Sequence, residues 1–413
     1  MRIVSGCGAE AAVERLAARG GEFGKLEPRV RKIVEDVRRD GDRALRRYAQ
    51  RWDGLGVKQS LQVSGRELAA SWKSLAPSLQ KSLREAEKNI RVFCDWQKLN
   101  SWNRSRAGIS LGQLVRPLGS VGCYVPGGRY PLLSTVLMTV IPAQVAGVKN
   151  VRVVSPKPSA EVLGAAAMLG VNEFYRVGGA QAVAALAHGT KSIRRVDRIV
   201  GPGNAYVTVA KKLVAFDCAI DFLAGPTEAI IMSESGNPDF IASDLVAQAE
   251  HDADALSVFI TTSQKLAQSV ALSVLRFAAD NPTAQESLKA RGVILVAASR
   301  AQTREWANRL APEHITVSKQ DVPFVQNAGS IFVGDYSSQA AGDYASGPNH
   351  VLPTGGQARF RGGLSVLDFV KVTTVQELSA AGLRKIAPTI ECLAAAEGLP
   401  AHGNAIRVRC GHA

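Results

Sequence analysis

Clustered cysteines are missing from this chain of 413 residues. Its six cysteines are Cys7, Cys94, Cys123, Cys218, Cys392 and Cys410, and no two of them form a C-x-x-C pair. Scattered cysteines argue against a disulfide framework and against a zinc site built from thiolates. Their distribution fits a reducing compartment, and we expect a cytoplasmic protein.

A long uninterrupted apolar run is missing as well. The longest candidate, residues 132–148, is broken by serine, threonine, glutamine and a proline, whereas a membrane-spanning helix needs about 20 predominantly apolar residues. The first eight residues lack the basic stretch and the apolar core of a secretory signal. We therefore expect no membrane association.

Aromatic residues make up only 6% of the chain, which bears on how its net charge of +14 is interpreted. Residues 1–120 carry 24 Lys and Arg against 13 Asp and Glu, so they hold +11 of that charge. The charges share helical segments with an apolar stripe, as in residues 29–39, and such charges usually lie on a solvated helix face. Because neither stacking aromatics nor a nucleic-acid-binding signature accompanies them, we expect no nucleic-acid partner.

The order of helical and strand patterns indicates the fold class. Helical signals fill residues 26–97, with Pro28 in a first-turn position and capping-box spacing from Ser64 to Glu67. From residue 121 onward, short Val- and Ile-rich runs alternate with helical ones, which is typical of βαβ units and a parallel sheet. Strands are expected at 151–154, 173–177, 196–200, 228–232, 257–262, 293–297, 314–317 and 330–333.

Helices are expected between these strands, at 160–169, 181–187, 205–214, a stretch ending at residue 251, 264–278 and 304–309. We therefore predict an α/β protein with two successive doubly wound, Rossmann-like parallel-sheet units. A helical N-terminal segment precedes them and a small, mostly helical C-terminal tail domain follows. Two such units in succession suggest a duplication.

Glycine-rich turns follow two of the strand patterns. Residues 121–128 and 199–206 each place backbone N–H groups where a phosphate could approach. Neither turn has the spacing of a dinucleotide fingerprint. Spacing alone therefore indicates only an α/β enzyme with a nucleotide and a metal ion as candidate ligands.

The metal is indicated by four of the six histidines, which lie in short polar stretches. These histidines are His251, His314, His350 and His402. In a helix ending at His251, Gln248 and His251 would project from one face. Imidazoles, carboxylates and one amide oxygen suit Zn²⁺, and the lack of clustered cysteines favours an open, catalytic site over a closed structural one.

Long motifs then combine in an order that we recognise. They are G-P-G-N-A-Y-V-T (201–208), A-G-P-T-E (224–228), Q-A-E-H (248–251), A-P-E-H (311–314), N-A-G-S-I-F-V-G (327–334), G-D-Y-A-S-G-P-N-H-V-L-P-T (342–354) and E-C-L-A-A-A-E (391–397). Together they closely resemble the histidinol dehydrogenase family over nearly the whole chain. The resemblance implies oxidation of L-histidinol through L-histidinaldehyde to L-histidine with two NAD⁺, the last steps of histidine biosynthesis.

The resemblance also implies roles for single residues. The implied ligands of one Zn²⁺ per site are Gln248, His251, Asp343 and His402. Glu313 and His314 match the acid/base pair, with His314 as the base and Glu313 activating water. Positions that contact NAD are Tyr124, Gln181 and Asn204. Thr227, His350 and Glu397 match substrate contacts, which the zinc ligands and His314 share. Thr227 stands where the family usually has serine.

The expected organisation is a homodimer with shared active sites. Its parts are an N-terminal segment 1–25, a larger zinc-binding α/β domain formed by 26–123 with 227–364, a Rossmann-like domain 124–226 that contacts NAD, and a tail domain 365–413 that crosses to the partner. Extended-looking residues 371–375 and an Ala- and Leu-rich helix at 383–397 fit a tail that needs burial against another surface.

Three other functions stay open at this point. A relative acting on another small alcohol, such as a sulfopropanediol, would keep the zinc ligands and the Glu–His pair. A zinc hydrolase would use Glu313 to activate a metal-bound water, and a nucleic-acid-binding protein ranks last. Cys123, beside Tyr124, is a tempting nucleophile for aldehyde oxidation, but we interpret it as a buried small hydrophobe. His188 and His412 are interpreted as structural.

Overall fold

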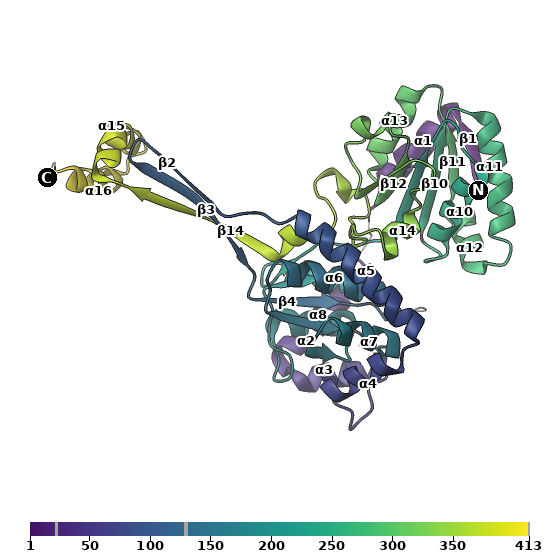
Figure 1. Ribbon diagram of the computed structural model, residues 1–413, viewed down its shortest axis with the longest axis horizontal. Coiled ribbons are helices and arrows are strands. Elements are labelled where there is room, and N and C mark those ends of the chain that lie inside the picture. Colours follow the sequence, from purple (N-terminus) through teal and green to yellow (C-terminus); the bar gives the residue numbers. More distant parts are fainter. Residues whose placement is uncertain (21–23, 128–130, 412–413) are drawn as a thin grey trace. The chain divides into compact units, whose positions relative to one another are not determined.

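The computed structural model describes residues 1–20, 24–127 and 131–411 (Figure 1). The chain forms two compact units, Met1–Gln97 with Gly119–Phe369, and Lys98–Leu118 with Val370–Ala413. The larger unit holds two parallel sheets and the smaller one an antiparallel sheet. None of the helices in the described ranges is long and apolar enough to cross a membrane.

A five-stranded parallel sheet occupies the first half of the larger unit. Its strands, in chain order, are β4 (Ser120–Tyr124), β5 (Asn150–Val154), β6 (Glu173–Tyr175), β7 (Arg198–Val200) and β8 (Ala219–Ile220). They lie side by side in the order β6-β5-β4-β7-β8. The connecting helices are α6 (Leu133–Val145), α7 (Ala160–Met168), α8 (Gly179–His188) and α9 (Ala205–Val214).

A six-stranded parallel sheet occupies the rest of the larger unit, in the order β1-β11-β10-β9-β12-β13. Its strands are β1 (Arg2–Ser5), β9 (Glu228–Met232), β10 (Leu256–Thr261), β11 (Val293–Val296), β12 (His314–Val317) and β13 (Ser330–Val333). Its helices are α1 (Gly6–Ala17), α10 (Pro238–Ala249), α11 (Gln264–Phe277), α12 (Pro282–Ala290), α13 (Arg300–Leu310) and α14 (Gln339–Tyr344). Short 3-10 helices lie at Val322–Phe324, Gln357–Arg359 and Val366–Phe369.

Both parallel sheets have the same winding. If β1 is set aside, each sheet starts with a central strand, adds two strands on one side and then two on the other. This is a doubly wound order with a topological switch point, between β4 and β7 in one sheet and between β9 and β12 in the other. The predicted fold class is therefore confirmed, and the repeated winding agrees with a duplication.

The N-terminal helices α2 (Glu27–Asp40), α3 (Asp42–Trp52), α4 (Gly65–Ser74) and α5 (Pro77–Trp96) pack on the five-stranded half. The apolar stripe of α2 shares a core with residues of β4, α8 and α9. This differs from the expected division, which grouped residues 26–123 with the zinc-binding domain. An amphipathic stripe reveals that a helix is buried, but it does not say against which sheet.

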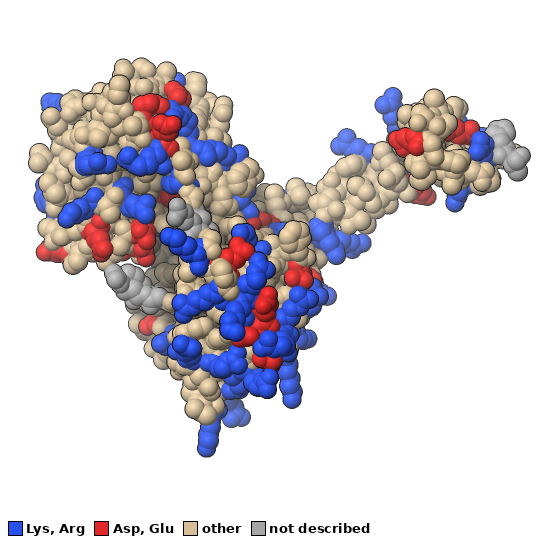
Figure 2. Space-filling view, turned by 180° about the vertical axis from the view of Figure 1, so that it is seen from behind, with Lys and Arg blue, Asp and Glu red and all other residues tan. Residues whose placement is uncertain are grey.

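The basic residues of α2 and α3 lie among acidic ones (Figure 2). Arg39 and Arg47 both contact the carboxylate of Asp36, while Arg43 pairs with Asp40. The arginine side chains of these pairs are more than half exposed. A solvated helix face, as predicted, accounts for this part of the positive charge.

The smaller unit contains three antiparallel strands and two helices. The strands are β2 (Trp102–Arg106), β3 (Ile109–Pro117) and β14 (Val370–Leu378), with β3 in the centre. The helices are α15 (Ala380–Ala396) and α16 (Pro400–Cys410). The expected tail domain began at residue 365 and did not include residues 98–118, because a strand pairing across some 250 positions leaves no local signal.

Candidate functional site

Glu313 and His314 lie at the amino end of β12, beside the amino end of β9. His314 begins β12 and is in register with Ala229 of β9. The preceding helix α13 ends at Leu310, and Ala311 turns the chain with a left-handed φ of 44°. This conformation is uncommon for a residue other than glycine and often occurs at functional sites.

Glu313 is buried and held by two hydrogen bonds. The Thr227 hydroxyl donates to Glu313 Oε2 at 2.6 Å, and the backbone N–H of Glu228 donates to the same oxygen at 2.8 Å. Burial raises the pKa of Glu313 well above the ordinary value, although both hydrogen bonds oppose this rise. A carboxyl group with a raised pKa holds a proton more readily than an exposed carboxyl group does.

His314 contacts the carbonyl group of the same residue, Glu228. Its Nδ1 lies 3.1 Å from the carbonyl oxygen of Glu228. Burial lowers the pKa of His314, while the Asp343 carboxylate works in the opposite direction. A neutral ring that donates from Nδ1 leaves Nε2 as a free acceptor, 3.8 Å from Asp343 Oδ1.

Gln248 and Thr227 extend this network. The side-chain amide N–H of Gln248, in the last turn of α10, donates to the Thr227 hydroxyl at 2.6 Å. The hydroxyl in turn donates to Glu313, so Thr227 supplies a hydrogen-bonding hydroxyl at the position where the family usually has serine. With its nitrogen engaged in this way, Gln248 has its carbonyl oxygen available for a cation.

His251 is not part of the helix. Helix α10 ends at Ala249, and His251 lies in the bend that follows, with an exposed side chain. The expectation that Gln248 and His251 share one helical face is therefore wrong. Beyond Ala249 the helical spacing is continued by the Glu250 N–H, which donates to the Val246 carbonyl at 3.0 Å, and then by a longer contact of 3.4 Å from the His251 N–H to the Gln248 carbonyl.

Asp343 and His350 complete the neighbourhood of His314. His350 Nδ1 lies 2.9 Å from the backbone carbonyl of Asp343, which belongs to α14. Burial lowers the pKa of His350, Asp343 opposes this, and the nearby His314 and His251 lower the pKa further. Asp343, His350, His314 and His251 therefore lie near one another, and all four are predicted site residues.

Two further predicted residues belong to the smaller unit. His402 is an exposed residue of α16, and Glu397 follows α15. Among the described residues, no three His, Cys, Asp or Glu side chains are grouped closely enough to bind a metal ion. Gln248 is of another type and is not covered by this statement.

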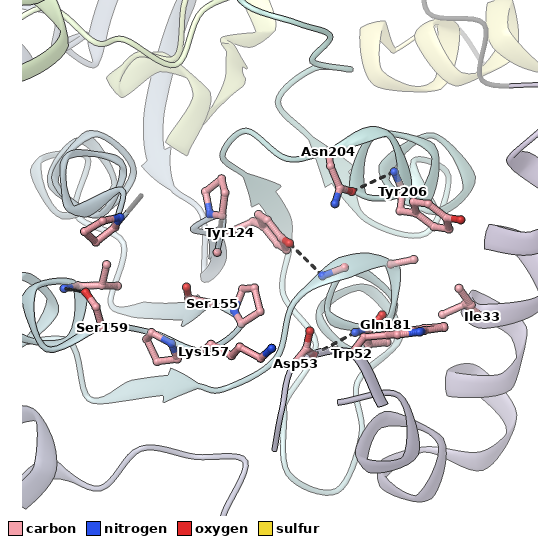
Figure 3. Close-up of a pocket in the computed structure, with 18 of the residues that line it drawn as sticks. Ile33, Trp52, Asp53, Tyr124, Ser155, Lys157, Ser159, Gln181, Asn204 and Tyr206 are labelled. Atoms are coloured by element: carbon pink, nitrogen blue, oxygen red, sulfur yellow. Dashed lines mark hydrogen bonds between the residues drawn. The ribbon is translucent and has the colours of Figure 1, made fainter. Parts of the chain in front are cut away.

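A cavity of about 670 Å³ opens at the carboxyl ends of β4, β5 and β7 (Figure 3). It includes all three residues expected to contact NAD, namely Tyr124, Gln181 and Asn204. The Tyr124 hydroxyl accepts a hydrogen bond from the Gly179 N–H at 2.9 Å, and Asn204 caps α9. Ligands of doubly wound sheets bind at such a switch point.

Several residues of this cavity were not anticipated from the sequence. Asp53 Oδ2 accepts hydrogen bonds from the Gly178 N–H and the Gln181 side chain, both at 3.0 Å. Burial raises the pKa of Asp53. Arg29 and Lys157 bring positive charge to the same wall. Lys157 has a left-handed φ of 44°, which the sequence does not reveal.

The other candidate residues have structural surroundings. Cys123 is fully buried, and burial raises the pKa of its thiol to about 12, so it is a poor nucleophile at neutral pH. Burial also lowers the pKa of His188, at the end of α8. His412 lies outside the described residues.

Comparison with known proteins gives a consistent result. Residues 17–410 match the family model described as histidinol dehydrogenase. The chain is 43% identical over 407 residues to a histidinol dehydrogenase of Aquifex aeolicus, covering 96% of both chains. It is 45% identical over 393 residues to that of Escherichia coli, covering 92% of this chain and 90% of the relative.

Solved structures agree with these relatives. A crystal structure of histidinol dehydrogenase from Elizabethkingia anophelis matches with a TM-score of 0.93 and 33% identity, covering 99% of this chain and 98% of the other. An acetylating aldehyde dehydrogenase from Geobacillus thermoglucosidasius, at 12% identity and a TM-score of 0.51, shares the fold alone. The chain therefore belongs to the histidinol dehydrogenase family.

Proposed function

We propose that this protein oxidises L-histidinol through L-histidinaldehyde to L-histidine with two NAD⁺, as the final steps of histidine biosynthesis. The observation that carries the proposal is the buried pair of Glu313 and His314, both in contact with the backbone of Glu228. Family membership supports the same conclusion.

In the first half-reaction, His314 is the base. Its Nε2 accepts the proton of the substrate hydroxyl. Hydride leaves the carbon that bears this hydroxyl and is transferred to NAD⁺, which gives the aldehyde and NADH. Because burial lowers the pKa of His314, the ring is ready to accept a proton at neutral pH.

In the second half-reaction, Glu313 activates water. The carboxylate accepts one proton of the water that adds to the aldehyde, which gives the anion of the hydrate. This anion loses hydride to the second NAD⁺ and becomes the carboxylic acid, and Glu313 then releases its proton to solvent. The raised pKa of Glu313 makes its carboxylate a stronger base than an exposed one. The hydrogen bonds from Thr227 and Glu228 to Oε2 hold the Glu313 carboxylate in place.

The proposed metal ligands are Gln248, His251 and Asp343, with His402 from a second copy. One amide oxygen, two imidazoles and one carboxylate are suitable donors for Zn²⁺, and the engaged nitrogen of Gln248 leaves its oxygen free for this purpose. When bound, Zn²⁺ would hold the imidazole and the amine of the substrate. His350, Thr227 and Glu397 are the proposed further contacts of the substrate.

The proposed NAD site is the cavity lined by Tyr124, Gln181 and Asn204. The positive charges of Arg29 and Lys157 suit a pyrophosphate. Asn204, the N-cap of α9, also lines this cavity, so the N-terminus of the helix faces the proposed site. A cavity of about 670 Å³ is within the usual range for a bound cofactor.

We propose a homodimer in which the tail of each chain completes the partner's site. No three His, Cys, Asp or Glu side chains are grouped as a metal site among the described residues, and His402 and Glu397 belong to the smaller unit. Exposed apolar residues of the smaller unit, among them Leu393, Leu399 and Val408, support burial of this unit against another surface.

The proposal is tested by absorbance at 340 nm with purified protein, NAD⁺ and L-histidinol, run beside a sulfopropanediol. We expect two NADH per L-histidinol and slow or no turnover of the other alcohol. Preference for the sulfopropanediol would assign the chain to a different small alcohol. Absence of NADH with either substrate would contradict the dehydrogenase function and favour a hydrolase.

A further inference from the structure

Arg19 connects the end of α13, which leads to the Glu313–His314 pair, with the start of β9, which contacts that pair. It follows α1 and belongs to the N-terminal part of the chain, far in sequence from both strands of the site. Its side chain is only 15% exposed. A buried arginine needs several acceptors, and those of Arg19 lie next to the acid/base residues.

The first acceptor is the side chain of Glu228, at the start of β9. Arg19 Nε donates to Glu228 Oε1 and Nη2 donates to Oε2, each at 2.6 Å. The carboxylate is 4% exposed and also accepts a hydrogen bond from the Gly355 N–H at 2.9 Å. This is a bidentate ion pair, in which the planar guanidinium fixes the orientation of the carboxylate. A lysine cannot form such a pair.

The second set of acceptors consists of helix carbonyls. Arg19 Nη2 donates to the Leu310 carbonyl and Nη1 to the Leu16 carbonyl, each at 2.7 Å. Leu310 is the last residue of α13, three positions before Glu313. One guanidinium therefore holds both the end of α13 and the start of β9.

The backbone of Glu228 transmits this placement to the acid/base pair. Its N–H donates to Glu313, and its carbonyl oxygen contacts His314. These two groups belong to the peptide units on either side of the Glu228 Cα, so a displacement of this residue would move both Glu313 and His314. Catalytic groups need placement within about 0.5 Å, and a misplacement of about 1 Å can cost on the order of 100-fold in rate.

We propose that Arg19 is a positioning residue for the Glu313–His314 pair and acts through Glu228, while the cavity that we assign to NAD does not depend on it. The kinetic form of this proposal rests on the proposed function. Its structural form, the fixed position of the Glu228 peptide, does not.

The test compares Arg19→Met, Arg19→Lys, Glu228→Gln and the double variant Arg19→Met/Glu228→Gln with the unchanged protein. Arg276→Met is the matched control, because Arg276 pairs with Asp239 on an exposed surface of the same unit. For Arg19→Met we expect kcat with L-histidinol to fall about 10- to 100-fold, with KM for both substrates and the Kd of NAD⁺ changed less than about threefold.

Two further results are expected. Arg19→Lys keeps the positive charge but cannot form the bidentate pair with the Glu228 carboxylate. Its kcat should therefore lie between those of Arg19→Met and the unchanged protein. Because the two residues act as one unit, the double variant should be no worse than the poorer single variant. Hydrogen–deuterium exchange should become faster in the peptides covering residues 227–232 and 311–317, and it should stay unchanged in those covering 119–127.

The outcomes separate the two proposals. If the unchanged protein does not oxidise L-histidinol, the proposed function is wrong, and the exchange rates still decide whether Arg19 holds the Glu228 peptide. Unchanged kcat and unchanged exchange in a folded Arg19→Lys or Arg19→Met protein would overturn the positioning role. A rise in KM of about 10- to 100-fold with an unchanged kcat would overturn the positioning role as well. Should Arg19→Met fail to fold, Arg19→Lys and Glu228→Gln carry the same test.

Discussion

At the scale of single residues, Glu313 and His314 differ in what surrounds them, which allows their roles to be separated. Glu313→Gln keeps an oxygen that can accept from Thr227 and Glu228 but cannot take a proton from water. We expect this variant to slow aldehyde oxidation about 10²- to 10⁴-fold and alcohol oxidation much less. Single-turnover measurements with L-histidinaldehyde and with L-histidinol would show the difference.

His314→Ala should slow both half-reactions, because it removes the base of the first step and alters the pocket of the second. This variant is the comparison for Glu313→Gln in the same assays. Equal losses in both steps for the Glu313 variant would refute the division of labour between the two residues.

The metal prediction also belongs to this scale. Chelation should reduce turnover at least about 100-fold while the thermal unfolding temperature changes little, because the described hydrophobic cores consist of apolar side chains. His251→Ala should behave in the same way, and Zn²⁺ should restore only the chelated unchanged protein. Full activity in a preparation that elemental analysis finds free of metal would contradict this.

Much of the site could be predicted from the sequence because long motifs carry it, but its geometry could not. Spacing placed His251 on a helix that in fact ends two residues earlier. Asp53 and Lys157 line the cavity although no motif marked them, because the cavity joins α3 to loops more than 100 positions away. Local patterns predict local structure, whereas a cavity wall depends on tertiary packing.

At the scale of elements, the position of β7 against β4 depends on Gly201. Its φ of 110° favours glycine, and an added Cβ would overlap the backbone oxygen of Tyr124. Gly201→Ala should therefore weaken NAD⁺ binding at least about 10-fold, since the clash displaces Tyr124. Titration calorimetry with NAD⁺ would measure this. Gly170→Ala is the control, because Gly170 also has a positive φ but open space around it.

Asp321 ties α13 to the loop after β12. Burial alone would raise the pKa of Asp321, but hydrogen bonds from Arg300, Ser318 and Arg304 lower it to about 2, against 3.8 for the free side chain. A depressed pKa stabilises the fold above about pH 4, and this stabilisation is lost as the pH falls towards 2. Asp321→Asn should therefore cost about 2 kcal/mol at pH 7.

Urea denaturation would measure this difference at pH 7 and again at pH 3, where it should shrink. Asp254→Asn is the control, because Asp254 is exposed and contacts Arg291 only at 3.4 Å. That control should change the free energy of unfolding by less than about 0.5 kcal/mol. A pH-independent loss in the Asp321 variant would mean that packing and not charge is responsible.

Element types were predicted well where the signals are local. The Ser64 cap, the first-turn Pro28 and the eight expected strands agree with the structure, whereas β4 and β8 of the five-stranded sheet were not predicted. The strand β1 at the edge of the six-stranded sheet was missed, as was β3, because each pairs with a segment more than 200 positions away. Neither sequence carries a sign of its distant partner.

At the scale of the whole molecule, the shared-site proposal makes a prediction about mixtures. In a heterodimer of His251→Ala and His402→Ala chains, one site collects both lesions and the other collects neither. Two inactive parents should therefore regain up to about half of the activity per heterodimer. Co-refolding with two different affinity tags, followed by the NADH assay, would measure it.

Mixtures of each variant with itself are the controls for this experiment and should stay inactive. If purified heterodimers are also inactive, each chain builds its own site and the crossing tail is wrong.

The central strand of the smaller unit has a consequence for synthesis of the chain. Strand β3 has β2 on one side, but its other side pairs with β14, about 250 residues later. At roughly 5–20 residues per second, a nascent chain exposes that side of β3 for about 10–50 seconds. An open strand edge is a template for association with other chains. Messages truncated before residue 370 should therefore yield aggregating protein even though both parallel sheets are complete.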